Sequence, residues 1–134
     1  CPYVVRHYRA ETMTGLDRSM PDSEVVWLAV DSSHFVRPED SRAWRARHKI
    51  AYPILQDPSG EVARRYGART TPHMYVVDAE GTLRYAGAID DDPRGRASSP
   101  TNHVERAVSA LRAGKAPPRS QTEPYGCTVK FARR

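Results

Sequence analysis

The order of strand-like and helix-like segments constrains how this chain of 134 residues can fold more than any other feature of its sequence. Four apolar runs have the length and composition of strands: VVWLAV at 25–30, YPIL at 52–55, MYVV at 74–77 and LRYAGAI at 83–89. Helical segments are predicted around them, over 2–16, over 39–49, after Asp57-Pro58, and from the capping pair Asn102 and Glu105 to Gly114. This alternation, which ends in two runs joined by a short link, predicts an α/β fold with a mixed central sheet and helices on both faces.

Local signals make three of these predictions specific. The run at 25–30 is apolar throughout, which predicts a strand covered on both faces. Pro2 suits the first position of a helix, and apolar residues at helical spacing predict one helix over 2–16. Asp57 is expected to cap the short helix that follows, with Pro58 as its first residue.

Length and composition are those of one soluble globular domain, with 39% hydrophobic and 28% charged residues. No apolar run approaches the about 18 residues of a transmembrane helix, so no membrane span is expected. We expect the main domain to cover 1–115. Residues 116–134 are rich in proline and polar residues, and we expect them to form an irregular extension packed on the same domain.

The net charge of +5 raises the question of a nucleic-acid partner. The basic residues are scattered along the chain, and no helix-turn-helix, zinc-finger or RNA-binding aromatic pattern accompanies them. We therefore expect a solvated, arginine-rich surface and no nucleic-acid partner. Targeting signals would lie upstream of the first residue, so the compartment stays open between the cytoplasm and the periplasm or another exported location.

The two cysteines lie near opposite ends of the chain, at Cys1 and Cys127. Two cysteines exclude a disulfide framework, and without clustered histidines they indicate no zinc site, so no cofactor is expected. Cys1 precedes Pro2 at a predicted helix start, where the helix dipole and the first N–H groups favour the nucleophilic thiolate. The alternative is a small cysteine that only packs, and these two residues do not decide between the interpretations.

The dipeptide Thr71-Pro72 stands immediately before the apolar run MYVV. It is interpreted either as a cis-proline loop beside a reactive cysteine or as an ordinary trans proline that opens a strand. His73 follows and could stabilise a thiolate or move a proton, although a structural histidine is the alternative.

Four segments together resemble the redoxins of the alkyl hydroperoxide reductase and thiol-specific antioxidant group: CPYV at 1–4, YPIL at 52–55, VARRYGA at 62–68 and TPHMYVVD at 71–78. The later segments YAGAID, GKAPPRSQT and GCTVKF resemble its peroxiredoxin-like branch. The resemblance implies a thioredoxin-like redox domain whose first central strand would lie upstream of Cys1. It also implies that Cys1 is the nucleophile, that Thr71-Pro72 forms a cis-proline loop against it, and that Gly126-Cys127 belongs to the same pattern.

Two positions lack a cysteine that could act as a partner of Cys1. Val4 stands where a dithiol oxidoreductase has the second cysteine of Cys-x-x-Cys, and Thr70 stands where some relatives have a cysteine before the threonine-proline. Cys127 is then the only candidate within the chain to resolve an oxidised Cys1. The resulting hypothesis is a thiol-dependent oxidoreductase in which the Cys1 thiolate attacks a peroxide or a protein disulfide. Cys127 or an external thiol reductant such as thioredoxin would restore the thiol. The alternative hypothesis is a thioredoxin-fold module that binds an extended peptide beside Thr71-Pro72 without redox turnover.

Overall fold

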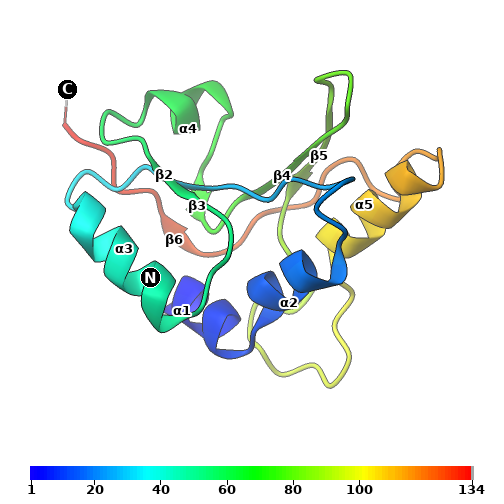
Figure 1. The fold of residues 1–134 in the computed structure, drawn as a ribbon, viewed down its shortest axis with the longest axis horizontal. Coiled ribbons are helices and arrows are strands. Elements are labelled where there is room, and N and C mark those ends of the chain that lie inside the picture. The colour runs from blue at the N-terminus through cyan, green and yellow to red at the C-terminus, as the bar shows by residue number, and fades with distance from the viewer. Residues whose placement is uncertain (134) are drawn as a thin grey trace. The chain divides into compact units, whose positions relative to one another are not determined.

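A computed structural model describes residues 1–133 of the chain. The helices are α1 (Pro2–Arg9), α2 (Thr12–Ser19), α3 (Pro38–Arg47), α4 (Glu61–Arg65) and α5 (His103–Arg112) (Figure 1). The strands are β1 (Ala29–Asp31), β2 (Ile54–Gln56), β3 (Thr70–Thr71), β4 (Met74–Val77), β5 (Leu83–Gly87) and β6 (Cys127–Thr128). They form three two-stranded sheets, β1 with β2, β3 with β6 and β4 with β5.

The chain divides into two compact units, and each is described by itself. The hairpin unit comprises Cys1 and Arg69–Cys127, and it contains the β4–β5 pair and α5. The parallel-strand unit comprises Pro2–Ala68 and the residues from Thr128 onward, and it contains β1, β2 and the first four helices. The predicted division at residue 115 remains a prediction.

The antiparallel hairpin of β4 and β5 was predicted from its two apolar runs and is confirmed. Met74 pairs with Gly87 and Val76 with Tyr85 across the two strands. Asp78 stabilises the turn between β4 and β5, because its Oδ1 accepts hydrogen bonds from the Glu80 and Thr82 N–H groups at 3.1 and 2.9 Å. A carboxylate that binds its own turn in this way needs only local sequence, which is why the hairpin was predictable.

Helix α5 begins at its predicted cap and packs along the hairpin (Figure 1). The Asn102 side chain accepts a hydrogen bond from the Glu105 N–H at 2.9 Å, as expected of an N-cap. The most deeply buried residues of this unit are Tyr85, Ile89 and Ala107 of α5, followed by Val104 of the same helix. These residues form the core that supports the hairpin.

The stretch that precedes Cys127 is bonded along β5 within the hairpin unit. Ser120 accepts a backbone hydrogen bond from the Ala86 N–H, and the Thr122 N–H donates one back to Ala86, each at 3.1 Å. The Thr122 hydroxyl also lies 2.6 Å from the Tyr85 hydroxyl and accepts from the Ala88 N–H at 3.0 Å. Gly87 permits this approach, since a Cβ there would lie 2.3 Å from Thr122 Oγ1.

Strand β1 differs from the prediction of a strand over 25–30 covered on both faces. Only Ala29–Asp31 form a strand, and they pair in parallel with Ile54–Gln56. Three side chains on one face are exposed: Val26 by 80%, Leu28 by 54% and Val30 by 46%. The prediction was wrong because successive residues of an extended segment face opposite sides, and the described residues cover one side only. Trp27, on the other side, packs on Tyr52 with ring centroids 5.6 Å apart.

The single helix expected over 2–16 is wrong, since the segment forms α1 and α2 with a break between them. Glu11 adopts a left-handed conformation with φ of 55°, which interrupts the helical hydrogen-bond ladder. The break lets Tyr8 of α1 and both Met13 and Leu16 of α2 become buried. The helical spacing of apolar residues therefore predicted helical structure on both sides of Glu11 but did not predict the break at Glu11 itself.

The start predicted for the short helix at Asp57-Pro58 is also wrong, because α4 begins at Glu61 after Gly60. Asp57 still serves this helix, since its carboxylate accepts hydrogen bonds from the Ala63 N–H at 3.1 Å and the Ser32 hydroxyl at 2.8 Å. Burial alone would raise the pKa of Asp57, but these hydrogen bonds outweigh it and hold the pKa below its usual value.

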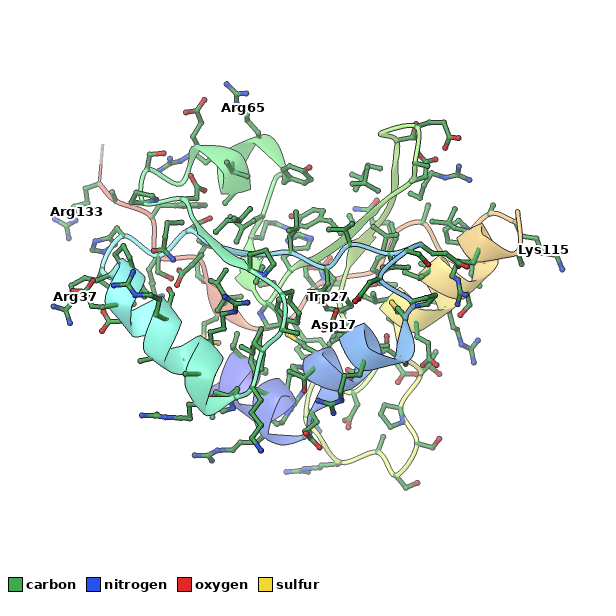
Figure 2. All side chains as sticks on the ribbon, in the orientation of Figure 1. Asp17, Trp27, Arg37, Arg65, Lys115 and Arg133 are labelled. Atoms are coloured by element: carbon green, nitrogen blue, oxygen red, sulfur yellow. The ribbon has the colours of Figure 1, made fainter. Side chains whose placement is uncertain are left out.

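The arginine-rich surface has the solvated character expected from the scattered charges. Figure 2 shows the side chains of Arg37, Arg65, Lys115 and Arg133 pointing away from the ribbon. Arg37 and Arg65 form ion pairs with neighbours on their own helical segments, with side chains 67% and 78% exposed. Such exposed pairs contribute little to stability.

Candidate functional site

The Cys1 thiol is exposed and lies directly before α1, whose first residue is Pro2. Its Sγ donates a hydrogen bond to the carbonyl oxygen of Thr71 at 3.2 Å. The first cysteine and the Thr71-Pro72 loop therefore meet in one place, although 70 positions separate Cys1 from Thr71.

The Thr71-Pro72 peptide bond is cis, which confirms the predicted cis bond and excludes the trans alternative. The loop is closed by the Thr70 hydroxyl, which donates to the Pro72 carbonyl oxygen at 2.7 Å. Thr70 and Thr71 form β3, so the carbonyl that receives the thiol belongs to a strand.

Gly126 brings the second cysteine to the same loop. Its φ is 145°, a conformation that favours glycine, and a Cβ there would lie 2.1 Å from the Thr71 carbonyl oxygen. Cys127 follows in β6, which pairs with β3, and its thiol is free and half-buried. The segments carrying Cys1 and Cys127 thus converge on one residue, Thr71.

His73 follows the cis proline and has a defined partner. Its Nδ1 accepts a hydrogen bond from the Arg69 N–H at 3.2 Å, and its ring stacks on Tyr75 with centroids 4.6 Å apart. Burial and the charge of Arg69 lower the pKa of His73, while Glu123 opposes them. The ring is therefore neutral near pH 7, with its proton on Nε2.

The ion pair of Arg69 and Glu123 was missed by sequence reasoning. Their side chains lie 3.1 Å apart and join the start of the cis-proline loop to the stretch that leads into Cys127. The two residues are 54 positions apart, and no spacing or motif in the sequence connects them.

The site as described consists of two thiols, one cis-proline loop and one neutral histidine. Among residues 1–133, no group of three or more His, Cys, Asp or Glu side chains is arranged to hold a metal ion. No helix in that range has the length and apolar character needed to cross a membrane. An exposed thiol with a second thiol on the adjoining segment can support nucleophilic attack followed by disulfide formation.

Comparison with known proteins places the chain among redoxins. Residues 10–86 match the AhpC/TSA family. A peroxiredoxin of Aeropyrum pernix is 38% identical over a segment that covers 46% of this chain and 28% of that protein. A putative peroxiredoxin of Mycobacterium tuberculosis is 30% identical over 42% of this chain and 36% of its own length. This chain thus spans well under half of the length of these curated relatives.

Two solved structures share the fold along almost the whole chain. A hypothetical protein of Sinorhizobium meliloti superposes with a TM-score of 0.82 at 28% identity, covering 98% of this chain and 74% of that one. An uncharacterized conserved protein of Geobacillus kaustophilus gives a TM-score of 0.85 at 28% identity, covering 100% and 73%.

The family match includes Thr71 and Pro72 but neither cysteine. It covers more than half of the chain, and the curated relatives agree with it. The chain therefore belongs to the AhpC/TSA family and is a peroxiredoxin-like redoxin with a thioredoxin-like fold.

Proposed function

We propose that this protein is a thiol-dependent peroxidase whose nucleophile is Cys1. The observation that carries the proposal is the exposed Cys1 thiol, directly before α1 and bonded to the Thr71 carbonyl oxygen. The Cys1 thiol first releases its proton, and the thiolate attacks one oxygen of a hydroperoxide so that the O–O bond breaks. The departing oxygen takes up one proton, and the products are a sulfenic acid on Cys1 and an alcohol or water. The peroxide is reduced and the sulfur is oxidised by two electrons.

Cys127 is the proposed resolving thiol. Its thiol attacks the sulfenic sulfur, a disulfide forms and water leaves. The approach of Gly126 to Thr71 supports this role, because it brings the chain segment before Cys127 to the residue that already binds Cys1. An external dithiol, such as that of thioredoxin, would then exchange with the disulfide and regenerate both thiols.

The residues around the loop are proposed to position the substrate. Pro2 follows the nucleophile in the chain as the first residue of α1, and the Thr71 carbonyl oxygen of the cis-proline loop accepts the Cys1 thiol. His73 is neutral with a proton on Nε2, so that it can donate a hydrogen bond to a peroxide oxygen. A protein disulfide is the second candidate substrate for the same thiol.

Trapping of the sulfenic acid tests the proposal. Hydrogen peroxide is added to the wild type, Cys1→Ser and Cys127→Ser in the presence of dimedone, and the products are identified by mass spectrometry. We expect an intramolecular disulfide in the wild type, a trapped sulfenic acid on Cys1 in Cys127→Ser, and neither product in Cys1→Ser.

Two results would contradict the peroxidase proposal in different ways. Absence of any Cys1 oxidation, with alkylation of Cys1 titrating near the ordinary thiol value of about 8.5, would favour a peptide-binding module without redox turnover. Oxidation of Cys1 with Cys127 remaining free would retain the nucleophile and exclude the resolving role.

A further inference from the structure

We infer that residues 126–127 of the chain occupy the strand edge beside Cys1 and thereby prevent an extended polypeptide from pairing with that edge. The inference rests on the proposed role of Cys1 and narrows its substrate class. It also distinguishes between the peroxide and the protein disulfide, which the sequence left open.

The edge beside Cys1 is the backbone of β3. An extended peptide gains affinity by adding a strand to a free sheet edge, through its main-chain hydrogen bonds. The strand β3 already pairs with β6 (Figure 1). The Thr71 carbonyl oxygen already accepts the Cys1 thiol at 3.2 Å. A polypeptide substrate therefore finds this edge occupied.

The approach of Gly126 leaves no room for a third strand. A Cβ on this residue would lie 2.1 Å from the Thr71 oxygen and 3.3 Å from the Pro72 nitrogen. Adjacent strands need a separation of about 4.7–4.9 Å, so no further backbone fits between Gly126 and the loop.

The tail from Ser120 to Cys127 is held at several points in the hairpin unit, so a competing peptide must break several bonds to displace it. Backbone bonds join it to Ala86, and side-chain bonds join Thr122 to Tyr85 and Ala88, Glu123 to Arg69, and Tyr125 to Asp90. Because each bond of the tail would be exchanged for one of similar strength, a strand of similar length gains little by replacing the tail.

A small peroxide does not meet this obstacle. The Cys1 thiol is exposed, and attack on the peroxide oxygen requires access to the sulfur alone. Exchange with a protein disulfide instead needs the sulfur of an extended chain to reach Cys1, so that a mixed disulfide forms and the second thiol leaves.

Two probes with the same leaving group measure access separately from thiol reactivity. One is 5,5′-dithiobis(2-nitrobenzoate), and the other is an extended peptide whose central cysteine carries thionitrobenzoate in a mixed disulfide. Both release thionitrobenzoate, whose absorbance is followed. The protein is Cys127→Ser, in which Cys1 is the only thiol because the chain has 2 cysteines.

We expect Cys1 to react with the peptide probe at least about tenfold more slowly than with the small probe, after division by the same ratio for free glutathione. In Gly126→Ala on this background, the added Cβ displaces the tail, and the peptide rate divided by the small-probe rate of the same variant should rise about tenfold. Gly114→Ala is the matched control, because Gly114 also has a positive φ, of 72°, but its Cβ would meet nothing within 4 Å.

Equal normalised rates for the two probes in Cys127→Ser would overturn the inference. The same conclusion follows if hydrogen exchange shows that residues 120–127 open in Gly126→Ala but the peptide rate does not rise. If that variant does not fold, Thr122→Val loosens the tail by removing its hydroxyl contacts with Tyr85 and Ala88. Failure of hydrogen peroxide to oxidise Cys1 would instead count against the peroxidase proposal, since the disulfide probes do not depend on it.

Discussion

The hydroxyl oxygens of Tyr8 and Tyr52 lie 2.7 Å apart inside the parallel-strand unit, and the exposed fractions of the two residues are 7% and 4%. The Tyr52 hydroxyl also interacts with the Trp27 side chain. Burial raises the pKa of Tyr8, and burial together with Tyr8 raises that of Tyr52, so both phenols stay protonated. A helix and a distant loop are therefore joined by a buried polar contact.

Replacing either tyrosine alone leaves the hydroxyl of the other without this partner, so the losses of unfolding free energy in the two single variants should not be additive. Tyr52→Phe removes the hydrogen-bond partner of both the Tyr8 hydroxyl and the Trp27 N–H, so we expect a loss of about 1–3 kcal/mol of unfolding free energy. Tyr8→Phe should cost less, because Tyr52 keeps Trp27. The double variant should cost less than the sum of the two.

Urea unfolding of the four proteins measures this coupling. Tyr66→Phe, at a residue that is 48% exposed, serves as the control for the same chemical change outside this buried contact. Additive losses in the double variant would mean that the two hydroxyls do not depend on one another.

His73 should titrate below its ordinary value of about 6.5 in the folded protein. Burial and Arg69 lower its pKa, and Glu123 raises it, so Arg69→Ala should move the midpoint up and Glu123→Gln should move it down. The ring proton signals of His73 in NMR spectra report the midpoint directly. Identical midpoints in both variants would show that neither charge acts on the ring.

The His73 shift also predicts how stability depends on pH. The folded-state pKa is depressed, so the unfolded chain binds this proton first as the pH falls. The contribution of the neutral His73 ring to the free energy of unfolding is complete above about pH 6.5, and it is lost as the pH falls through the folded-state pKa. The fall in unfolding free energy between pH 7 and 5 should be smaller in His73→Gln, which cannot titrate, than in the wild type.

A disulfide between Cys1 and Cys127 should stabilise the protein against unfolding. In the chain-entropy model, closing the loop of about 125 residues between them contributes on the order of 5 kcal/mol, reduced by any strain in the native state. Peroxide treatment should therefore raise the urea midpoint of the wild type and leave that of Cys127→Ser unchanged. A wild type that forms the disulfide, confirmed by mass, but loses stability would indicate a strained bond.

Gly60 and Gly67 form a matched pair for testing the packing of Phe131. Both have a positive φ, of 70° and 68°, but a Cβ on Gly60 would lie 2.4 Å from the Phe131 ring and one on Gly67 would meet nothing within 4 Å. Alanine at Gly67 should cost about 1–2 kcal/mol from the left-handed backbone alone. Alanine at Gly60 should cost about 1–3 kcal/mol more, because the ring must move.

Thermal or urea unfolding of Gly60→Ala and Gly67→Ala gives the difference. Addition of Phe131→Ala to both variants should bring their costs together. Persistence of the difference without the ring would assign it to the backbone at Gly60.

The sequence by itself determined the elements whose hydrogen bonds are local. The hairpin of β4 and β5 depends on Asp78 binding its own turn, and α5 depends on Asn102 binding Glu105. Ordered motifs also indicated the redoxin family and the cis bond at Thr71-Pro72. These signals lie within a few residues of one another, so chain order is enough to read them.

Tertiary structure decided what depends on contacts between distant residues. The break at Glu11 and the exposed face of Val26 and Leu28 follow from which surfaces find cover, and apolar spacing alone does not report this. The meeting of Cys1, Thr71 and Gly126 is likewise a long-range arrangement. The sequence could propose that these residues share one site, but only the folded backbone brings the thiol, the carbonyl and the glycine together.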